Sequence, residues 1–130
     1  MKKVFISHPF RNDPEGNMQK IRLIEKRLAA LGIAYFSPLS NYRALEDTDA
    51  NQRAFGLRCC KEWIPYCDEL WLFGEWWKSE GCQRELATAI LLFDDLHPMP
   101  IRAVIGWKDD FPLFVPWGQP EWLLRQGDQS

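Results

Sequence analysis

The part of the chain best suited to chemistry is the segment Ser79-Glu80-Gly81-Cys82-Gln83-Arg84-Glu85. Ser79 suits the N-cap of a helix, whose first-turn N–H groups and dipole attract anions. Gly81 lacks a side chain, so a ligand can approach the backbone closely there. Glu85 lies four residues later on the same helical face, and its side chain tilts back toward the helix start. Such a carboxylate could act as a nucleophile on a sugar carbon or stabilise an oxocarbenium-like centre.

Each candidate residue also has a plainer explanation. Serine followed by an acidic residue is a common way to begin a helix, and Glu85 could simply face solvent. In the loop after the first predicted strand, His8 either holds a phosphate or sugar hydroxyl or packs without touching a ligand. Arg11 either binds a phosphate or pairs with Asp13 on the surface. The loop has no G-x-G-x-x-G pattern, so the fingerprint of a dinucleotide site is absent.

Tryptophans and cysteines supply the remaining candidates. Trp76 and Trp77 precede Ser79, and adjacent exposed tryptophans either stack on a ligand or are buried at an interface. The cysteines lack the CxxC spacing that zinc sites use, so no metal site is expected. We expect free, buried and inert thiols, with a reactive thiol as the alternative. These cysteines are Cys59, Cys60, Cys67 and Cys82.

Alternating strands and helices must position these residues. Short apolar runs bounded by turn residues predict strands at 3–7, 33–37, 69–73 and 101–106. Helices are predicted from Pro14 (with Asp13 as its cap) to Leu31, from about 50 to 65, and from Ser79 to about Leu96. The expected buried stripes are Met18, Ile21, Ile24 and Leu28 on the first helix and Leu86, Ala89, Ile90 and Phe93 on the third. The apolar members of the second helix are Phe55, Cys59, Cys60, Trp63 and Ile64.

This alternation predicts an α/β fold with three layers and a mostly parallel sheet of four to five strands, as in flavodoxin-like and Rossmann-like proteins. Ligands bind outside the carboxyl ends of the strands in such sheets. We therefore expect the loops at 8–13, 38–49 and 74–81 to meet there, with the polar, irregular stretch 39–49 folding over the site. Residues 107–130 show no clear period, although 119–126 could form a short helix.

The composition indicates one globular domain over residues 1–130, of which 107–130 form a C-terminal extension. A net charge of −2 with mixed signs leaves no broad basic surface, so we expect no nucleic acid polymer as partner. We find no signal-peptide pattern and no long apolar stretch, so we expect no membrane association and a cytoplasmic location. Seven tryptophans exceed what one small core needs, so we expect a homo-oligomer, a dimer or larger.

Three blocks of residues, in this order, resemble a known family. They are Phe5-Ile6-Ser7-His8-Pro9-Phe10, then Cys67-Asp68-Glu69-Leu70-Trp71-Leu72-Phe73-Gly74, then Ser79-Glu80-Gly81 followed by Glu85 and Ala89. Together they are similar to the nucleoside 2-deoxyribosyltransferase-like superfamily, and most of all to its small DUF4406 members. The resemblance covers about residues 3–106 and leaves out the C-terminal segment.

The resemblance implies roles for the candidate residues. Glu85 would attack the anomeric carbon of a deoxyribose, and Ser79 would touch the phosphate of a nucleoside 5′-monophosphate. The loop after the first strand would line the sugar and base pocket. The expected substrate-binding residues, including those proposed from their own chemistry, are Ser7, His8, Phe10, Arg11, Ser79, Gly81 and Trp77.

Two positions depart from the family pattern. The family often has glycine where this chain has His8, which implies a narrower pocket. Active members also carry an aspartate on the second helix that positions or protonates the base, and Cys60 stands at that place. The acids that could take over its work are Glu62, Glu46 and Asp47.

We therefore hypothesise an N-glycosidase or deoxyribosyltransferase that acts on a nucleoside or nucleoside 5′-monophosphate, with Glu85 as its nucleophile. We expect it to need no metal and no cofactor, and to stack the base on a tryptophan or on Phe10. The first alternative is a non-catalytic nucleotide-binding protein of the same fold, which the departure at Cys60 favours. The second is an interaction subunit that assembles through its tryptophans.

Overall fold

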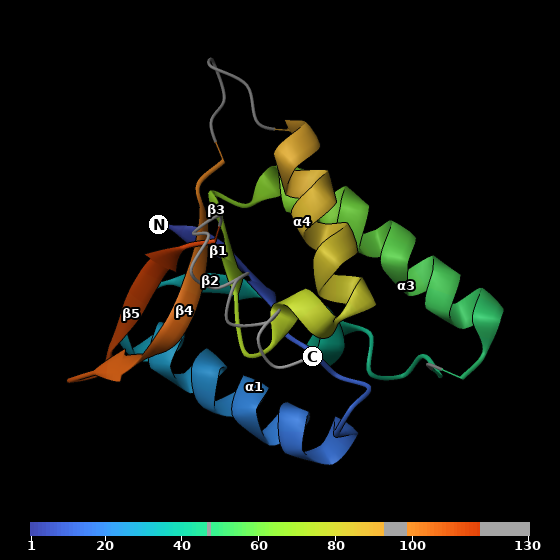
Figure 1. Cartoon of the computed structure of the whole chain (residues 1–130), viewed down its shortest axis with the longest axis horizontal. Coiled ribbons are helices and arrows are strands. Elements are labelled where there is room, and N and C mark those ends of the chain that lie inside the picture. Colours follow the sequence, from blue (N-terminus) through green and yellow to red (C-terminus); the bar gives the residue numbers. More distant parts are fainter. Residues whose placement is uncertain (47, 93–98, 118–130) are drawn as a thin grey trace, which may run out of the picture.

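A five-stranded sheet forms the centre of the computed structural model, which describes residues 1–46, 48–92 and 99–117 (Figure 1). The strands are β1 Lys3–Ser7, β2 Ala34–Phe36, β3 Glu69–Leu72, β4 Ile101–Lys108 and β5 Phe111–Pro116. Their order in the sheet is β2-β1-β3-β4-β5. All neighbours pair in parallel except β5, which runs antiparallel to β4. This arrangement confirms the predicted α/β fold with a mostly parallel sheet.

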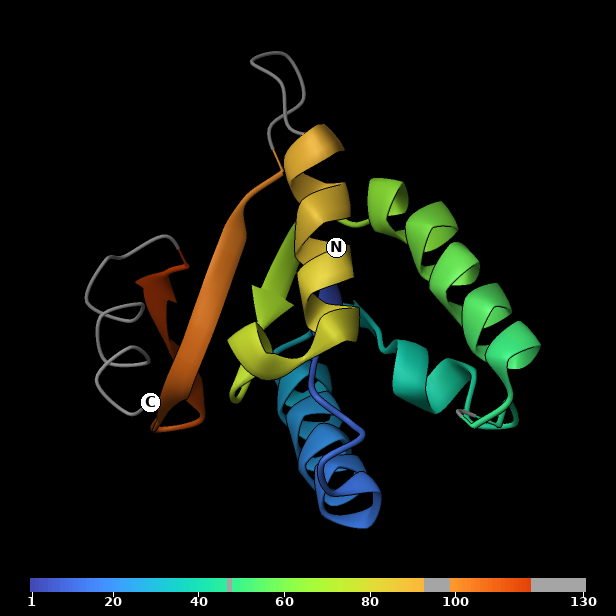
Figure 2. The ribbon, with the colours of Figure 1, turned by 45° about the vertical axis from the view of Figure 1, so that its right-hand side comes forward.

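Helices cover both faces of the sheet (Figures 1 and 2). The helix α1 (Pro14–Ala30) lies on one face, and α3 (Ala50–Trp63) and α4 (Glu80–Leu92) lie on the other. From β1 the chain moves outward to β2 and then returns past β1 to β3, so the strand order reverses between β1 and β3. Ligands of such sheets bind at this switch point, outside the carboxyl ends of the strands. No helix within the described ranges has the length and hydrophobicity needed to cross a bilayer.

The face under α1 is packed by alternate residues of the central strands. Val4, Ile6 and Trp71 contact a stripe on α1 that includes Ile24 and Leu28. The helix begins as predicted, with Pro14 in its first turn and the carboxylate of Asp13 accepting from the N–H of Gly16 at 3.2 Å. The start of α1 is therefore fixed close to the end of β1, beside the switch point.

The opposite face is packed by α3 and α4. Buried residues of the strands, of α3 and of α4 form one cluster there, which includes Phe5, Leu70, Leu72, Cys60, Ile64, Cys82, Leu86 and Ala89. On α4 the buried residues are Cys82, Glu85, Leu86 and Ala89, which recur at helical spacing and form one stripe toward the sheet. One member of that apolar stripe, Glu85, carries a carboxylate.

Several apolar residues of α3 and α4 are exposed. On α3, Phe55 and Trp63 are 47% and 44% exposed, and the buried residue of this helix is Cys60. Ile90 on α4 is also exposed, although its neighbour Ala89 is buried. In both helices the apolar residues outnumber the positions that face the sheet, so a pattern of apolar spacing overstates the buried face. The predicted end of the third helix, with Phe93, lies outside the described residues.

Two segments have more regular structure than the sequence predicted. In the stretch expected to be irregular, Pro38 ends β2 and also opens the short helix α2 (Pro38–Asn41). After β4, Asp109 and Asp110 have φ of 50° and 67°, which suits a two-residue turn into β5. The hairpin was not predicted, because Pro112 argued against a strand there. Proline is nevertheless tolerated in an edge strand such as β5. The helix suggested at 119–126 lies outside the described residues.

The cysteines are free thiols, as expected. Cys60 and Cys82 are buried, and Cys59 and Cys67 are half-buried. Burial raises the pKa of Cys82 to about 12 and the pKa of Cys67 to about 11, so both stay protonated at neutral pH. Within residues 1–46, 48–92 and 99–117, no three His, Cys, Asp or Glu side chains gather as a metal site requires.

Candidate active site

The strand β1 delivers one hydroxyl group, that of Ser7, to the interior on the α4 side. Side chains alternate along a strand, so Phe5 and Ser7 face α3 and α4, whereas Ile6 faces α1. Ser7 is completely buried, and its hydroxyl donates to Oε1 of Glu85 at 2.7 Å. The last residue of β1 thus holds the carboxylate that α4 brings to the carboxyl end of the sheet.

Glu85 is a buried carboxyl group without a cationic partner. Glu85 is only 8% exposed. No cation in the described part of the chain forms an ion pair with its carboxylate. Burial raises the pKa of Glu85 to about 7, and hydrogen bonds from Ser7 and Cys60 counteract part of this rise. Near neutral pH the group is therefore divided between its charged and neutral forms. Strongly perturbed carboxyl groups in clefts are typical of functional sites.

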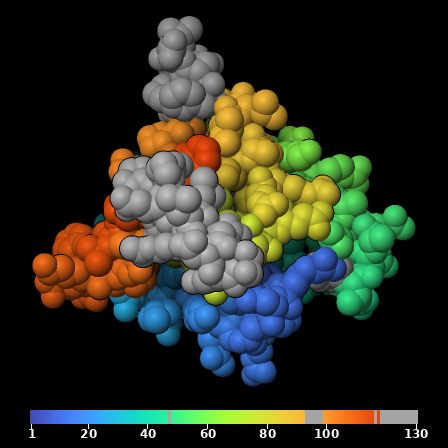
Figure 3. Space-filling view, in the orientation of Figure 1, coloured from blue at the N-terminus to red at the C-terminus, as the bar shows by residue number. Residues whose placement is uncertain are grey.

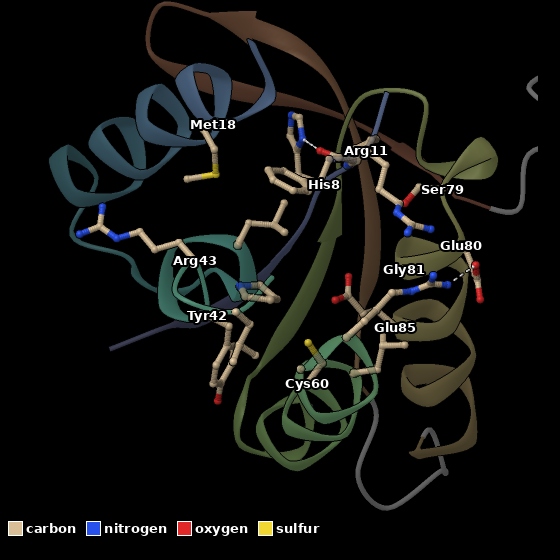
Figure 4. A pocket seen from close by; sticks show the side chains of 18 of the residues that line it. His8, Arg11, Met18, Tyr42, Arg43, Cys60, Ser79, Glu80, Gly81 and Glu85 are labelled. Carbon is tan, nitrogen blue, oxygen red and sulfur yellow. Dashed lines mark hydrogen bonds and ion pairs between the residues drawn. The ribbon is translucent and has the colours of Figure 1, made fainter. Parts of the chain in front are cut away.

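Cys60 of α3 is the third member of this group, and its thiol lies near the Glu85 carboxylate (Figure 4). Burial, followed by the negative charge of Glu85, raises the pKa of the Cys60 thiol far above its usual range. The thiol therefore stays neutral and acts as a weak hydrogen-bond donor. At the place where the family pattern has an aspartate, this chain has a group that carries no charge.

An open cleft of about 700 Å³ lies beside Glu85, a volume within the usual range of small-molecule sites. Its walls come from the segments after β1, β2 and β3, which are the loops expected to meet there, and from α1, α2 and α3. Figure 3 shows the segment before α1 (blue) lying against α4 (yellow) and next to α3 (green). The cleft thus occupies the switch point of the sheet.

The end of the cleft at the start of α4 is polar. Ser79 caps this helix, because its Oγ accepts from the N–H of Cys82 at 3.2 Å. A Cβ added at Gly81 would have Ser79 Oγ, at 3.9 Å, as its nearest neighbour, so the first turn is open to a ligand. Arg11 extends from the β1 loop toward Ser79, and Lys78 also lines this end (Figure 4). The N–H groups, the helix dipole and these cations together suit an anion such as a phosphate.

The rest of the wall is mostly apolar. Its apolar members are Ile6, Pro9, Phe10, Met18, Pro38, Leu39, Tyr42, Leu45 and Leu57. Of this set, the sequence-based prediction named Phe10 as a binding residue and placed Met18 in the core. Pro38 and Leu39 could have been found, because they directly follow the carboxyl end of a strand. An apolar wall next to an anion site suits a flat heterocycle joined to a phosphorylated sugar.

Three residues predicted to bind substrate have other contacts. Ser7 is fully buried, donates to Glu85 and does not line the cleft. Trp77 packs against the core cluster and also does not line the cleft.

His8 lines the cleft, so both explanations for this residue stay open. Its ring stacks on Phe73 with 6.2 Å between centroids, and its Nδ1–H donates to the carbonyl oxygen of Pro9 at 2.7 Å. Burial lowers the pKa of His8, and its side chain points away from Glu85 (Figure 4).

The acids that could stand in for the family's aspartate lie in different places. Glu46 lines the cleft from the loop between α2 and α3, where it is exposed. Glu62 is exposed on α3 and does not line the cleft. Asp47 lies outside the described residues. Of the two possible replacements for the aspartate that have a described position, Glu46 and Glu62, only Glu46 borders the candidate site.

The chain was also compared with known proteins. A family model described as "Domain of unknown function (DUF7768)" matches residues 2–94. Among solved structures, the chain is similar to a 2-deoxyribosyltransferase from the psychrotolerant bacterium Bacillus psychrosaccharolyticus, a biocatalyst for the synthesis of nucleosides. The TM-score is 0.56 and the identity 25%, over 78% of this chain and 72% of that one. No curated protein matches significantly in sequence. The likeness to the DUF4406 members stays a prediction.

Proposed function

The chain belongs to the DUF7768 family, a domain of unknown function, and from its site we propose that it cleaves the N-glycosidic bond of a nucleoside or nucleoside 5′-monophosphate. The observation that carries this proposal is the buried carboxylate of Glu85, held by Ser7 at 2.7 Å beside a cleft with an anion-attracting helix start. The structural similarity to a 2-deoxyribosyltransferase supports a role in glycosyl transfer.

In the proposed reaction, the ionised carboxylate of Glu85 attacks C1′ of the sugar. Its Oε1 accepts the hydrogen bond from Ser7, which leaves Oε2 to form the ester bond. The C1′–N bond breaks, and its electron pair leaves with the base. Water then releases the sugar from Glu85, which is the glycosidase outcome, whereas a second base gives a new nucleoside, which is the transferase outcome.

In this proposal the two ends of the cleft bind the other parts of the substrate. The phosphate binds at the start of α4, near Ser79, Gly81 and Arg11, and the base binds along the apolar wall with Phe10 and Tyr42, all of which line the cleft. The sugar then lies between them, next to Glu85. Because the phosphate and the base are held apart from the reacting carbon, their binding energy can be used to orient C1′ toward the carboxylate.

Base release from a panel of deoxynucleosides and their 5′-monophosphates, followed by chromatography, tests this proposal. We expect Glu85→Gln to lower kcat/KM by at least ~1,000-fold, as for the loss of a nucleophile. The matched control is Glu62→Gln, an exposed glutamate outside the cleft, which should keep the wild-type rate. If Glu85→Gln released base as fast as the wild type, the mechanism would be wrong.

A non-catalytic nucleotide-binding protein is the second candidate, and the position of Cys60 favours it. The thiol cannot do the work of an acid or base beside Glu85, because its pKa lies far above neutral pH. Calorimetry with the same panel separates the two candidates. Saturable binding of a nucleotide without any release of base would support the binding protein.

The expected homo-oligomer stays a prediction, and the edge strand β5 is the surface that supports it. Phe111, Leu113 and Phe114 are 61%, 41% and 37% exposed there. Exposed apolar side chains on an edge strand favour association with another chain. Light scattering of the purified protein would give the number of subunits.

A further inference from the structure

A neutral base needs a proton when it leaves a sugar, and the carboxyl groups around the cleft are poorly placed to supply it. In the described wall, the carboxyl groups other than Glu85 are Glu46, Glu75 and Glu80. Glu75 pairs with Lys78 at 2.8 Å, and Glu80 pairs with Arg53 at 2.9 Å. Both carboxylates are therefore already engaged in ion pairs. Glu46 is exposed on a loop, and the structure gives it no hydrogen bond that would aim its carboxyl group into the cleft.

The other titratable groups of the described wall are also unsuited to donate a proton. The thiol of Cys60 and the phenol of Tyr42 have pKa values raised by burial. His8 has a lowered pKa because it is buried, so it is neutral at pH 7. The Nδ1 proton that His8 does carry is bonded to the carbonyl oxygen of Pro9, at 2.7 Å. Glu85 itself is needed in its ionised form for the attack on C1′.

No cation among the described residues is paired with Glu85, although Arg11, Arg43, Arg53 and Lys78 line other parts of the cleft. Its bonded neighbours are the hydroxyl of Ser7 and the thiol of Cys60, which are both neutral. An ionised carboxylate in such a place carries an uncompensated cost of burial. A substrate that brings a positive charge beside Glu85 would offset this cost and favour the ionised, attacking form of the carboxylate.

We propose that the substrates of this cleft are N-glycosides whose base already carries a positive charge, such as a pyridinium or an N7-alkylated purine. This inference rests on the proposed function and narrows its substrate class. When the C1′–N bond breaks, the electron pair neutralises the ring, so the base leaves as a neutral molecule and takes no proton. Glu85 gains the bond to C1′, water replaces Glu85 there, and the surplus proton of the water passes to solvent.

The test compares 7-methyl-2′-deoxyguanosine with 2′-deoxyguanosine, which differ by one methyl group and one positive charge. Base release by the full chain is measured for both, after subtraction of the release without protein. We expect kcat/KM to be at least ~100-fold higher for the methylated nucleoside, which is the low end of what a general acid would otherwise supply. Equal values would overturn this inference but leave the proposed function intact. Release from neither nucleoside would overturn both.

Cys60→Asp is the variant that sharpens the test, since it places a carboxyl group beside Glu85. We expect it to raise kcat/KM for the neutral nucleoside and so to reduce the ratio between the two substrates by at least ~10-fold. The matched control is Cys59→Asp, the same change one residue earlier, at a half-buried position outside the cleft, which should keep the ratio. A folded Cys60→Asp protein with the wild-type ratio would count against the inference.

Discussion

Two buried glutamates, Glu69 at the amino ends of the strands and Glu85 near their carboxyl ends, have opposite surroundings. Glu69 begins β3 and is 5% exposed, and it accepts from Lys2 at 2.6 Å, from Arg102 at 2.7 Å and from Trp71 at 3.1 Å. Burial alone would raise the pKa of Glu69, but these hydrogen bonds together lower it below its usual value. Glu85, at the carboxyl ends of the strands, has neutral neighbours and a raised pKa.

The difference shows how burial of the same chemical group can serve two purposes. At the amino ends of the strands, two cations and an indole satisfy the charge of Glu69, which ties the start of the chain to β3 and β4. At the switch point, Glu85 is buried without such compensation and borders a cleft. A fold tolerates an uncompensated carboxylate at a cost in stability, and such costs are typical of sites that bind or react.

The largest effect on stability is expected from Glu85→Gln, and it depends on pH. The folded state holds the proton of Glu85 up to about pH 7, whereas the unfolded chain releases it near pH 4.5. The folded protein therefore binds more protons between these values, and its stability falls as the pH rises through this window. The loss is on the order of 3 kcal/mol by pH 8. Glutamine carries no charge, so Glu85→Gln should escape this loss.

Urea unfolding of the wild type and of Glu85→Gln, at pH 4.5 and at pH 8, checks this expectation. The free energy of unfolding of Glu85→Gln, relative to that of the wild type, should be higher at pH 8 than at pH 4.5. Glu62→Gln is the control for an exposed glutamate, and it should follow the wild type at both. A constant difference between Glu85→Gln and the wild type would mean that the carboxylate is compensated in the folded protein.

A smaller effect of opposite sign is expected from Glu69→Gln. The change removes the charge that Lys2 and Arg102 compensate, and it should lower the free energy of unfolding at pH 7 by about 2 kcal/mol. This is less than for a fully buried pair, because the two cations are 49% and 45% exposed. Base release per folded molecule should stay at the wild-type level, since Glu69 lies at the amino end of β3 and does not line the cleft.

Both measurements on Glu69→Gln are informative. Loss of stability with normal base release would support the assignment of Glu69 to the scaffold alone. If the Glu69→Gln protein were folded but released no base, the contrast between Glu69 and Glu85 would be wrong, because Glu69 would then take part in the reaction.

The relation between Ser79, Gly81 and Glu85 could be predicted from sequence because it depends on spacing along one helix. Helical periodicity fixes which face a residue occupies, and a cap fixes where the helix begins. The alternation of strands and helices fixed the sheet and the edge at which its loops meet in the same way. The caps, the helical faces and the strand segments are local, so they follow from residues close together in the chain. The pairing of strands joins distant residues such as Val4 and Glu69, and it was inferred from the alternation of elements.

The contacts of Glu85 with other elements could not be predicted in this way. Cys60 reaches it because α3 and α4 pack side by side, and no spacing along the sequence reports that distance. The roles of His8 and Trp77 could not be decided from sequence either. The ring of His8 lines the cleft and also stacks on Phe73, and Trp77 packs against the core cluster, although both could equally have faced a ligand.

The central claim is that the carboxylate of Glu85 attacks the sugar, and the most direct test is to trap the product of that attack. The protein is quenched during reaction with a 2′-fluoro-2′-deoxynucleoside, whose glycosyl ester is hydrolysed slowly, and its peptides are measured by mass spectrometry. We predict that the peptide containing Glu85 gains the mass of one fluorinated sugar, and that Glu85→Gln shows no gain. Continued base release with no sugar on Glu85 would contradict the account.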